Sequence, residues 1–500
     1  MRSITAKGIR KSFDSKTILA GVNFAISEGG KLALIGENGS GKSTLLKILT
    51  GHLIPDQGEL FGDEQNCVLI AQDFSGKDEE TPRKFLNRRV KEIHKAIRML
   101  SQSGFDLGKN EVRLDSVKCG DLSGGEKKKL EIVAGMASGS TFIAMDEPEN
   151  HLDYQTIDWL VSVISKFYGG VVFVSHDQYF IDQLANSILE LEDGTITVYS
   201  MKYDDYLAEK ERQIAGQARD WVVEEKTIKR LRETVQMMKV RAARNSDTAA
   251  TYQQTKRRLK ELEDSHGKRP ALEPKQPKVR ISGVDQKRGK MIVSVEHLSF
   301  SYGNNRIFHD TSAELRFGEK VVLFGPNGSG KSTLVRLITG ELAPQNGTAR
   351  MGVSIKWQFM TQDHLAGIDR TLSALEVFQS TLKWPEHRCR ANLARYGINV
   401  DLVTRPLGIL SGGQQARFKL ALLFAQEPEF LILDEPTNHV DPPTWEAIVE
   451  AVKGYSGTVL AVTHDREFID AITERLWVIR DHKVFVEPGN LSEYLERKRR

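Results

Sequence analysis

Two glycine-rich stretches contain the residues best suited to chemistry. GENGSGKST (36–44) and GPNGSGKST (325–333) both fit the pattern G-x-x-x-x-G-K-[ST]. Each follows an apolar run and precedes a helical pattern, which is the context of a phosphate-binding loop. Glycine lets backbone N–H groups turn toward phosphate oxygens at a helix N-terminus. The sequence therefore predicts two sites for ATP, with Lys42 and Lys331 at the terminal phosphates. The residues expected to contact ATP in these loops are Gly36, Asn38, Gly39, Gly41, Lys42, Ser43 and Thr44, and Gly325, Asn327, Gly328, Gly330, Lys331, Ser332 and Thr333.

Paired carboxylates end two further apolar runs, TFIAMDEP and FLILDEP. Alone, such a pair would more often be a strand end with solvated acids, but the nearby phosphate loops favour a functional interpretation. Glu147 and Glu435 suit a base that orients the attacking water. Hydroxyl and carboxylate oxygens suit Mg²⁺. The expected Mg²⁺ ligands are therefore Ser43 and Asp146 in the first half and Ser332 and Asp434 in the second.

Two glutamines and two histidines are weaker candidates. Gln72 and Gln362 end apolar runs and are expected to contact both Mg²⁺ and the water, as part of the ATP site. His176 and His464 follow predicted strands in VFVSHD and LAVTHD, and are expected to contact the γ-phosphate as catalytic residues. A lone histidine in such a place is more often structural.

The motifs recur in one register, so the chain contains a duplicated α/β domain. LSGG occurs at 122–125 and at 410–413, each time before a basic helical stretch, and provides a second anion site at a helix start. Lys42 and Lys331 are 289 positions apart. The LSGG serines, the paired glutamates and the histidines are each 288 positions from their counterparts.

The combination of phosphate loop, LSGG and Asp-Glu in each half resembles the ATP-binding-cassette (ABC) ATPases. The resemblance implies that two cassettes close head to tail, so that each phosphate loop faces the LSGG of the other half. One site would combine the first-half residues Lys42, Asp146 and Glu147 with Ser411, Gly412 and Gly413. The other would combine Lys331, Asp434 and Glu435 with Ser123, Gly124 and Gly125. It also implies that Phe13 and Tyr302 stack on adenine. Glu149 departs from the second copy, which has Thr437, so the two sites are expected to bind ATP but can differ in rate.

The totals exclude several classes of protein. The chain has 500 residues, a net charge of +3 and three cysteines. No two cysteines form a CxxC pair, which argues against a structural zinc site, an iron–sulfur cluster or a disulfide framework. No apolar run reaches the length of a transmembrane helix, and the N-terminus lacks a signal peptide. A cytoplasmic protein is expected, in which any membrane contact would need another chain.

A basic helical hairpin is predicted between the halves, which gives three segments: cassette 1–200, linker 201–290 and cassette 291–500. Helical apolar spacing runs from Tyr203 to Met238, NSDT supplies a turn, and a second helix reaches about Asp264, with the tip near 240–249. Positions 226–260 contain eleven Lys or Arg and two acids, a local net charge of 11 − 2 = +9. Such charge indicates contact with a phosphate backbone, although a charge run is more often a solvated coiled coil. The expected RNA contacts are Lys239, Arg241, Arg244, Lys256, Arg257 and Arg258.

The stretches DEPENHLD and DEPTNHVD and the charged linker resemble the ABC-F group in particular. That resemblance implies a monomer, with its two cassettes paired within one chain, that binds the ribosome at the exit-tRNA site. The linker would reach toward tRNA and the peptidyl-transferase centre, and ATP hydrolysis would release the protein. Protection from antibiotics and rescue or regulation of translation both remain open. Other classes also remain: an ATPase subunit of a membrane transporter, or a DNA-associated ATPase.

Overall fold

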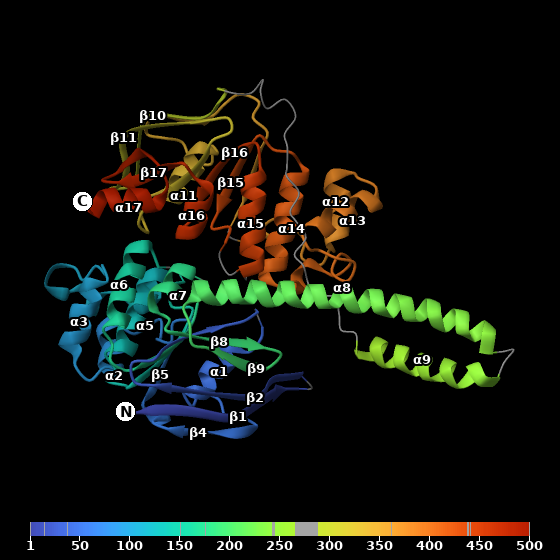
Figure 1. Ribbon diagram of the computed structural model, residues 1–500. Coiled ribbons are helices and arrows are strands. Elements are labelled where there is room, and N and C mark those ends of the chain that lie inside the picture. Colours follow the sequence, from blue (N-terminus) through green and yellow to red (C-terminus); the bar gives the residue numbers. More distant parts are fainter. Residues whose placement is uncertain are drawn as a thin grey trace. The chain divides into compact units, whose positions relative to one another are not determined.

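Two parallel sheets, one in each half, form the centre of the fold in the computed structural model (Figure 1). The structure describes the chain except residues 1, 15, 38, 151, 176, 243–245, 266–288, 362, 438–439, 441 and 500. It divides into two units, residues 1–202 with 275–500, and residues 203–274. The first unit thus contains both cassettes and the second contains the helical linker.

The sheets of the two halves have the same strand order. The first sheet runs β5 (Cys67–Ile70), β6 (Phe142–Asp146), β7 (Gly170–Val174), β3 (Lys31–Ile35), β8 (Ser187–Glu192) and β9 (Thr195–Tyr199). The second runs β14 (Trp357–Met360), β15 (Phe430–Asp434), β16 (Thr458–Val462), β12 (Lys320–Phe324), β17 (Arg475–Arg480) and β18 (Lys483–Pro488). All neighbours are parallel except the last pair of each sheet. β6, β7 and β16 are buried along their whole length, as is typical of strands in a parallel sheet covered on both faces.

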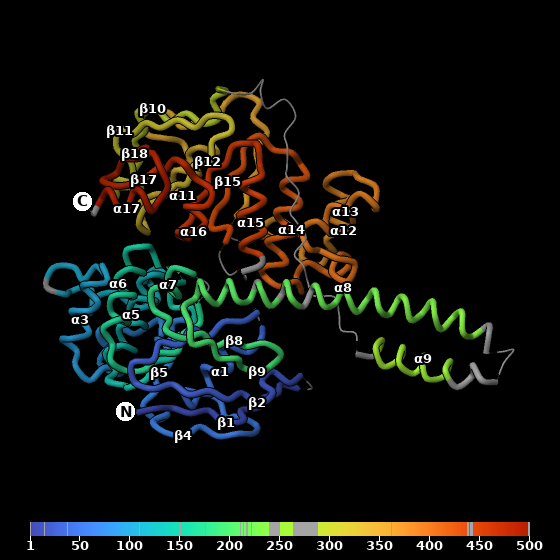
Figure 2. The backbone as a smooth tube through the Cα atoms, viewed as in Figure 1, coloured from blue at the N-terminus to red at the C-terminus, as the bar shows by residue number. Residues whose placement is uncertain are grey.

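The strand order places the phosphate loops at a switch point. β3 and β12 come first in their sheets along the chain but lie in the middle. The next three strands of each sheet lie on one side of them and the last two lie on the other. Ligands of open α/β sheets bind beyond the carboxyl ends of strands at such a point. α1 (Lys42–Leu49) and α11 (Lys331–Ile338) begin directly after these loops. The tube in Figure 2 traces the two halves.

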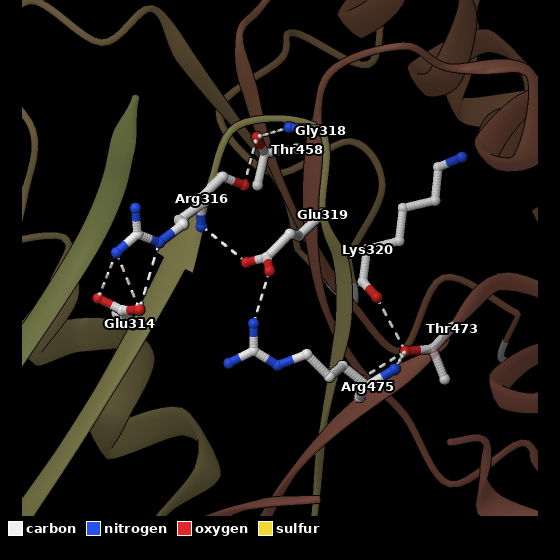
Figure 3. Close-up of polar contacts among 8 residues, drawn as sticks. All are labelled: Glu314, Arg316, Gly318, Glu319, Lys320, Thr458, Thr473 and Arg475. Atoms are coloured by element: carbon white, nitrogen blue, oxygen red, sulfur yellow. Dashed lines mark hydrogen bonds and ion pairs between the residues drawn. The ribbon is translucent and has the colours of Figure 1, made fainter. Parts of the chain in front are cut away.

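A three-stranded antiparallel sheet accompanies each parallel sheet. The strands are β2 (Lys16–Ser27), β1 (Ser3–Phe13) and β4 (Gln57–Gly62) in the first half, and β11 (Asn305–Arg316), β10 (Met291–Tyr302) and β13 (Asn346–Met351) in the second. Figure 3 shows how polar contacts join β11 to the parallel sheet. Glu319 accepts from the backbone N–H of Arg316 at 2.8 Å and forms an ion pair with Arg475 on β17. Thr458 on β16 accepts from the N–H of Gly318 at 3.0 Å.

Helices complete each cassette. In the first half they are α2 (Pro82–Arg89), α3 (Ile93–Gln102), α4 (Arg113–Ser116), α5 (Gly124–Met136), α6 (Tyr154–Ser165) and α7 (Gln178–Leu184). In the second they are α12 (Ala374–Leu382), α13 (Glu386–Arg395), α14 (Gly412–Ala425), α15 (Pro442–Gly454), α16 (Arg466–Ile472) and α17 (Leu491–Arg499). α2, α3 and α5 share an apolar core of their own around Phe85, Leu100 and Leu130. This core gives the LSGG helix a rigid support.

The linker is a helical hairpin formed by α8 (Tyr203–Ala242) and α9 (Ser246–Ser265). Both helices extend further into the predicted tip, 240–249, than expected, because alanines there favour helix. Ile228 on α8 and Leu259 on α9 are buried, and Arg232 forms an ion pair with Glu263 across the two helices at 2.6 Å. None of the described helices combines the length and apolar character that crossing a membrane requires.

The structure describes four of the six predicted RNA contacts, and their side chains are exposed. They are Lys239, Lys256, Arg257 and Arg258. Arg244 and the side chain of Arg241 lie outside the described part. Arg257 also pairs with Glu261 at 3.1 Å, which offsets part of its charge.

Candidate nucleotide sites

Both phosphate loops hold their lysine in the same way. Lys42 Nζ donates to the carbonyl oxygens of Gly36 at 2.7 Å and of Glu37 at 2.9 Å. Lys331 Nζ donates to the two matching carbonyls, of Gly325 at 2.8 Å and of Pro326 at 3.1 Å. Both lysine side chains are buried. The loop backbone therefore fixes each ammonium group beside the N-terminus of the following helix.

The backbone conformation and the surroundings of the last glycine of each loop disfavour any side chain. Gly41 and Gly330 precede the helices with φ angles of 108° and 105°. A Cβ atom on Gly41 would lie 2.5 Å from Ile18 Cγ2, and one on Gly330 would lie 2.4 Å from Ile307 Cγ2. Only glycine permits both the backbone conformation and the close approach of β2 and β11.

The first site is a cavity of about 580 Å³ that includes one residue of the opposite half, Gly412. Its lining residues are Phe13, Ile18, Gly39, Gly41, Lys42, Ser43, Thr44, Gln72, Asp146, Glu147, Val174 and Gly412. Apart from Ile18 and Val174, all of these were predicted from the sequence. Gly36 contributes its carbonyl to Lys42 instead. Ser411 and Gly413 adjoin Gly412 but do not line this cavity.

The second site is larger, about 1060 Å³, and combines residues of both halves. The predicted residues that line it are Ser123, Gly124, Gly125, Tyr302, Asn327, Gly328, Gly330, Lys331, Ser332, Thr333, Asp434, Glu435 and His464. The phosphate loop of one half and the LSGG of the other thus share one cavity. Asn38, His176 and Gln362 lie outside the described residues.

The two glutamates share an uncommon backbone conformation. Glu147 and Glu435 have φ angles of 45° and 47°, in the left-handed region that non-glycine residues rarely occupy. The N–H of Glu147 donates to the carbonyl of Val174 at 3.0 Å, and that of Glu435 donates to Val462 at 2.8 Å. Strained residues of this kind cluster at functional sites. No sequence pattern announces this conformation.

The partners that the structure describes for the two carboxylates come from different motifs, and Gln362 and Asn438, the counterparts of Gln72 and Asn150, lie outside the described residues. Glu147 Oε2 accepts from Gln72 Nε2 at 2.9 Å and from Asn150 Nδ2 at 2.6 Å. Glu435 accepts from the hydroxyl of Thr463, and burial raises its pKa. Asn150 was missed in the sequence, although its place three residues after Glu147 was a usable signal.

In the first site, two of the groups predicted to bind Mg²⁺ are hydrogen-bonded to each other. The hydroxyl of Ser43 donates to the carboxylate of Asp146, which is 7% exposed. Burial raises the pKa of Asp146, and the Ser43 hydrogen bond opposes this rise. Burial also raises the pKa of Asp434, while nearby Lys331 lowers it. A serine hydroxyl and a carboxylate beside a phosphate loop fit a hard divalent cation.

His464 is held in its neutral form. Burial, followed by the nearby charge of Lys331, lowers the pKa of His464 to about 3. A neutral imidazole keeps one N–H donor and one acceptor. The side chain lines the second cavity together with Lys331 and Glu435.

Each LSGG serine begins its helix with a reciprocal cap. Ser123 Oγ accepts from the N–H of Glu126, and Glu126 Oε2 accepts from the N–H of Ser123. Ser411 and Gln414 form the same capping box on α14. The cap is therefore the same in both halves, although Glu126 carries a negative charge and Gln414 does not. In the first half Arg113 offsets that charge through an ion pair of 2.7 Å with Glu126.

Residues after the first Asp-Glu pair contact the second half directly. Asp153 Oδ2 accepts from the N–H of Asn327 in the second phosphate loop at 3.2 Å. The ring of Tyr154 lies 4.5 Å from the ring of Phe324, and Tyr154 belongs to the apolar core of the second cassette. Arg466 donates to Asp158 at 2.7 Å. None of these contacts was predicted from the sequence.

A buried lysine that the sequence analysis missed lies behind the first site. Lys128 Nζ donates to the carbonyl oxygens of Ala71 at 3.0 Å, Gln72 at 3.3 Å and Asp146 at 3.3 Å. Burial lowers the pKa of Lys128, and the charge of Glu149 is the first of several carboxylate charges that raise it. A cation buried this deeply is retained only with such compensation.

The comparisons with known proteins agree with this geometry. The ABC transporter family matches residues 19–150 and 308–438, and a second family of the same description matches 189–281. ABC transporter F family member 2 of Arabidopsis thaliana is 29% identical, covering 99% of this chain and 79% of the relative. Ribosome protection protein VmlR of Bacillus subtilis is also 29% identical, covering 96% and 87%. The solved structure titled RNase-L Inhibitor shares the fold, with a TM-score of 0.67, 20% identity and coverage of 98% and 92%. The chain, with two ABC ATPase domains joined by a helical hairpin, belongs to the ABC transporter family and to its ABC-F group.

Proposed function

We propose that this protein is an ATPase that binds the ribosome with both ATP sites closed and leaves after hydrolysis. The observation that carries the proposal is the second cavity, where the phosphate loop at Lys331 and the LSGG at Ser123–Gly125 line one space. ATP bound there would touch both cassettes and hold them together. Hydrolysis would remove that link, so the nucleotide controls closure.

Binding uses three parts of each site. The phosphate loop supplies backbone N–H groups and a lysine, and the LSGG helix of the other half supplies a second N-terminus. Phe13 and Tyr302, each nearly half exposed at the cavity edge, would stack on adenine. Ser43 and Asp146 in the first site, and Ser332 and Asp434 in the second, would hold Mg²⁺, which would offset the negative charge of the phosphates.

Hydrolysis in the first site would use Glu147 as the base. Gln72 and Asn150 hold its Oε2, which fixes the direction of the carboxylate. The water oxygen bonds to the γ-phosphorus, the bond from that phosphorus to the β–γ bridging oxygen breaks, and the carboxylate takes the proton. Lys42 stabilises charge on the departing phosphate.

In the second site Glu435 takes the same part, oriented by Thr463. Because its pKa is raised, the Glu435 carboxylate would bind the proton released by the attacking water more strongly than an ordinary carboxylate. The neutral His464 would donate one hydrogen bond to the γ-phosphate without adding a positive charge. Glu149 in the first half and its counterpart Thr437 in the second differ in charge, which supports unequal turnover in the two sites.

The linker would contact RNA. Lys239 on α8 and Lys256, Arg257 and Arg258 on α9 are exposed, as groups that neutralise backbone phosphates must be. The similarity to a ribosome protection protein supports a ribosomal partner, with the cassettes at the exit-tRNA site and the hairpin directed toward tRNA and the peptidyl-transferase centre. Protection of the ribosome from an antibiotic bound near that centre is the role we favour.

The test is co-sedimentation with purified ribosomes at an ionic strength close to that of the cytoplasm. The variant Glu147→Gln/Glu435→Gln retains ATP binding but lacks the base, so it should pellet with ribosomes only when ATP is present. The matched control, Lys42→Ala/Lys331→Ala, should stay in the supernatant. Absence of ATP-dependent pelleting, with ATP binding intact, would contradict the proposal and favour a transporter or DNA partner.

A further inference from the structure

We propose that Lys128 is a positioning residue that ties the LSGG helix at the second site to Gln72 and Glu147 at the first site. This inference rests on the proposed ATPase activity. Lys128 lines neither cavity, and it links the two sites through one turn of a helix. The second cassette has no cation at the equivalent position.

The first observation is where α5 begins and what its first turn touches. Ser123 and Gly124 line the second cavity, so the start of the helix belongs to that site. Lys128, four residues later, donates to the carbonyls of Gln72 and Asp146, whose side chains line the first cavity. A displacement of the helix start is therefore transmitted directly to the Gln72 loop.

A second residue of α5, Glu131, contacts the same loop, residues 71–75. Glu131, which is 2% exposed, accepts from Ser75 Oγ at 2.8 Å and 2.7 Å and pairs with Arg89 at 2.7 Å. Lys128 and Glu131 are three residues apart and share one face of the helix. They hold the loop 71–75 from both ends with opposite charges.

The two halves also differ at Glu149, whose negative charge complements the positive charge of Lys128. Glu149 accepts from the buried hydroxyl of Ser175 at 2.6 Å and is the carboxylate that most favours the charged form of Lys128. With the 288-residue offset, Lys128 corresponds to Ala416 and Glu149 to Thr437. The second cassette lacks both charges, which indicates that they function as a pair.

The consequence for chemistry passes through Gln72. Its side chain donates to Glu147 Oε2, so the position of the loop backbone sets the direction of the base. When ATP draws the LSGG of the first cassette inward, Lys128 would move the loop with it and align Glu147. Loss of that tie should lower turnover at the first site and leave ATP affinity there unchanged.

The experiment measures each site separately. In a Glu435→Gln background only the first site turns over, and in a Glu147→Gln background only the second does. Adding Lys128→Met, which keeps the volume but removes the charge, should lower kcat about tenfold in the first background. In the second background kcat should change by less than about twofold. KM for ATP should stay the same in both.

A purely structural role would give a different result. General damage to α5 would lower turnover in both backgrounds, since the start of α5 serves the second site, and that outcome would overturn the inference. If Lys128→Met fails to fold, Lys128→Ala/Glu149→Thr gives the cassette the residues of the second half. That variant, tested in the Glu435→Gln background, should show the same loss.

Hydrogen exchange provides a measurement that does not depend on turnover. In the wild type, ATP should slow amide exchange in the loop 71–75, and Lys128→Met should remove this protection. Unchanged protection would contradict the tie even if the chain hydrolyses no ATP. If no background hydrolyses ATP but Lys128→Met still loses the protection, the proposed ATPase activity would be contradicted and the role of Lys128 would stand.

Discussion

Arg466→Gln should weaken the closure of the two cassettes. Arg466 Nη2 donates to Asp158 Oδ1 at 2.7 Å and to the carbonyl of Tyr154 at 3.3 Å. Its guanidinium carbon lies 3.9 Å from the centre of the Tyr179 ring. Gln178 occupies the equivalent position in the first cassette, so the substitution introduces a residue that the fold already accepts there.

The magnitude follows from burial and geometry. The Arg466 side chain is 11% exposed and that of Asp158 is 39% exposed, which places this ion pair between the surface and buried cases. We assign about 1 kcal/mol to the ion pair and about 1 kcal/mol to the cation–π contact. Their sum, about 2 kcal/mol, is about a 30-fold change in the closing equilibrium constant.

The assay is energy transfer between fluorophores placed one on each cassette. The background is Glu147→Gln/Glu435→Gln, which stops hydrolysis and lets closure reach equilibrium in ATP. Arg466→Gln should raise the ATP concentration at half-closure, and Asp158→Asn should have a similar effect. The double variant should be less damaging than the sum of the two, because the two residues share one interaction.

Arg475→Gln is the matched control. Arg475 forms an ion pair with Glu319 inside the second cassette, in the network of Figure 3. Its loss should lower thermal stability without changing closure. Equal effects of Arg475→Gln and Arg466→Gln on closure, or strict additivity of Arg466→Gln and Asp158→Asn, would refute the reasoning.

Two further substitutions test the sites. Gly330→Ala brings Cβ to 2.4 Å from Ile307 and should weaken ATP binding at the second site by more than tenfold, about 1.4 kcal/mol; in Gly340→Ala, where φ is +81° but nothing lies within 4 Å, equilibrium binding should stay near the wild-type value. Burial raises the pKa of Asp177 from 3.8 to about 6, so the native carboxyl binds a proton more readily and the free energy of unfolding falls as pH rises through that window. Asp177→Asn, which preserves the helix cap, should therefore raise the melting temperature above pH 6 and have little effect near pH 4, while an advantage largest at low pH would contradict the assignment.

The sequence predicted the motifs of each cassette because their chemistry is local. A phosphate loop needs its glycines and lysine in one short stretch, and a constant offset reveals the duplication. The pairing of each phosphate loop with the opposite LSGG came from the resemblance to ABC ATPases. In the structure Gly412 lines the first cavity without Ser411 and Gly413, whereas Ser123, Gly124 and Gly125 all line the second.

Contacts that depend on tertiary packing escaped the sequence analysis. Lys128 lies in the basic run EKKK, and nothing in that run distinguishes it from Lys127 and Lys129, which are only partly buried. Tyr154 was not singled out in the sequence, yet it belongs to the apolar core of the other cassette. Such roles depend on which faces two halves present to each other, and periodicity within one element does not specify them.

The left-handed backbone at Glu147 and Glu435 means that glycine would favour stability at these two positions, whereas the proposed activity requires glutamate. Each such residue costs about 1 to 3 kcal/mol, and glycine would remove most of that cost. A chain selected only for resistance to heat would therefore accumulate glycine at the two positions that we propose for the catalytic base. Laboratory evolution of this protein should be run with ATP turnover in the selection, since heat alone rewards the loss of its chemistry.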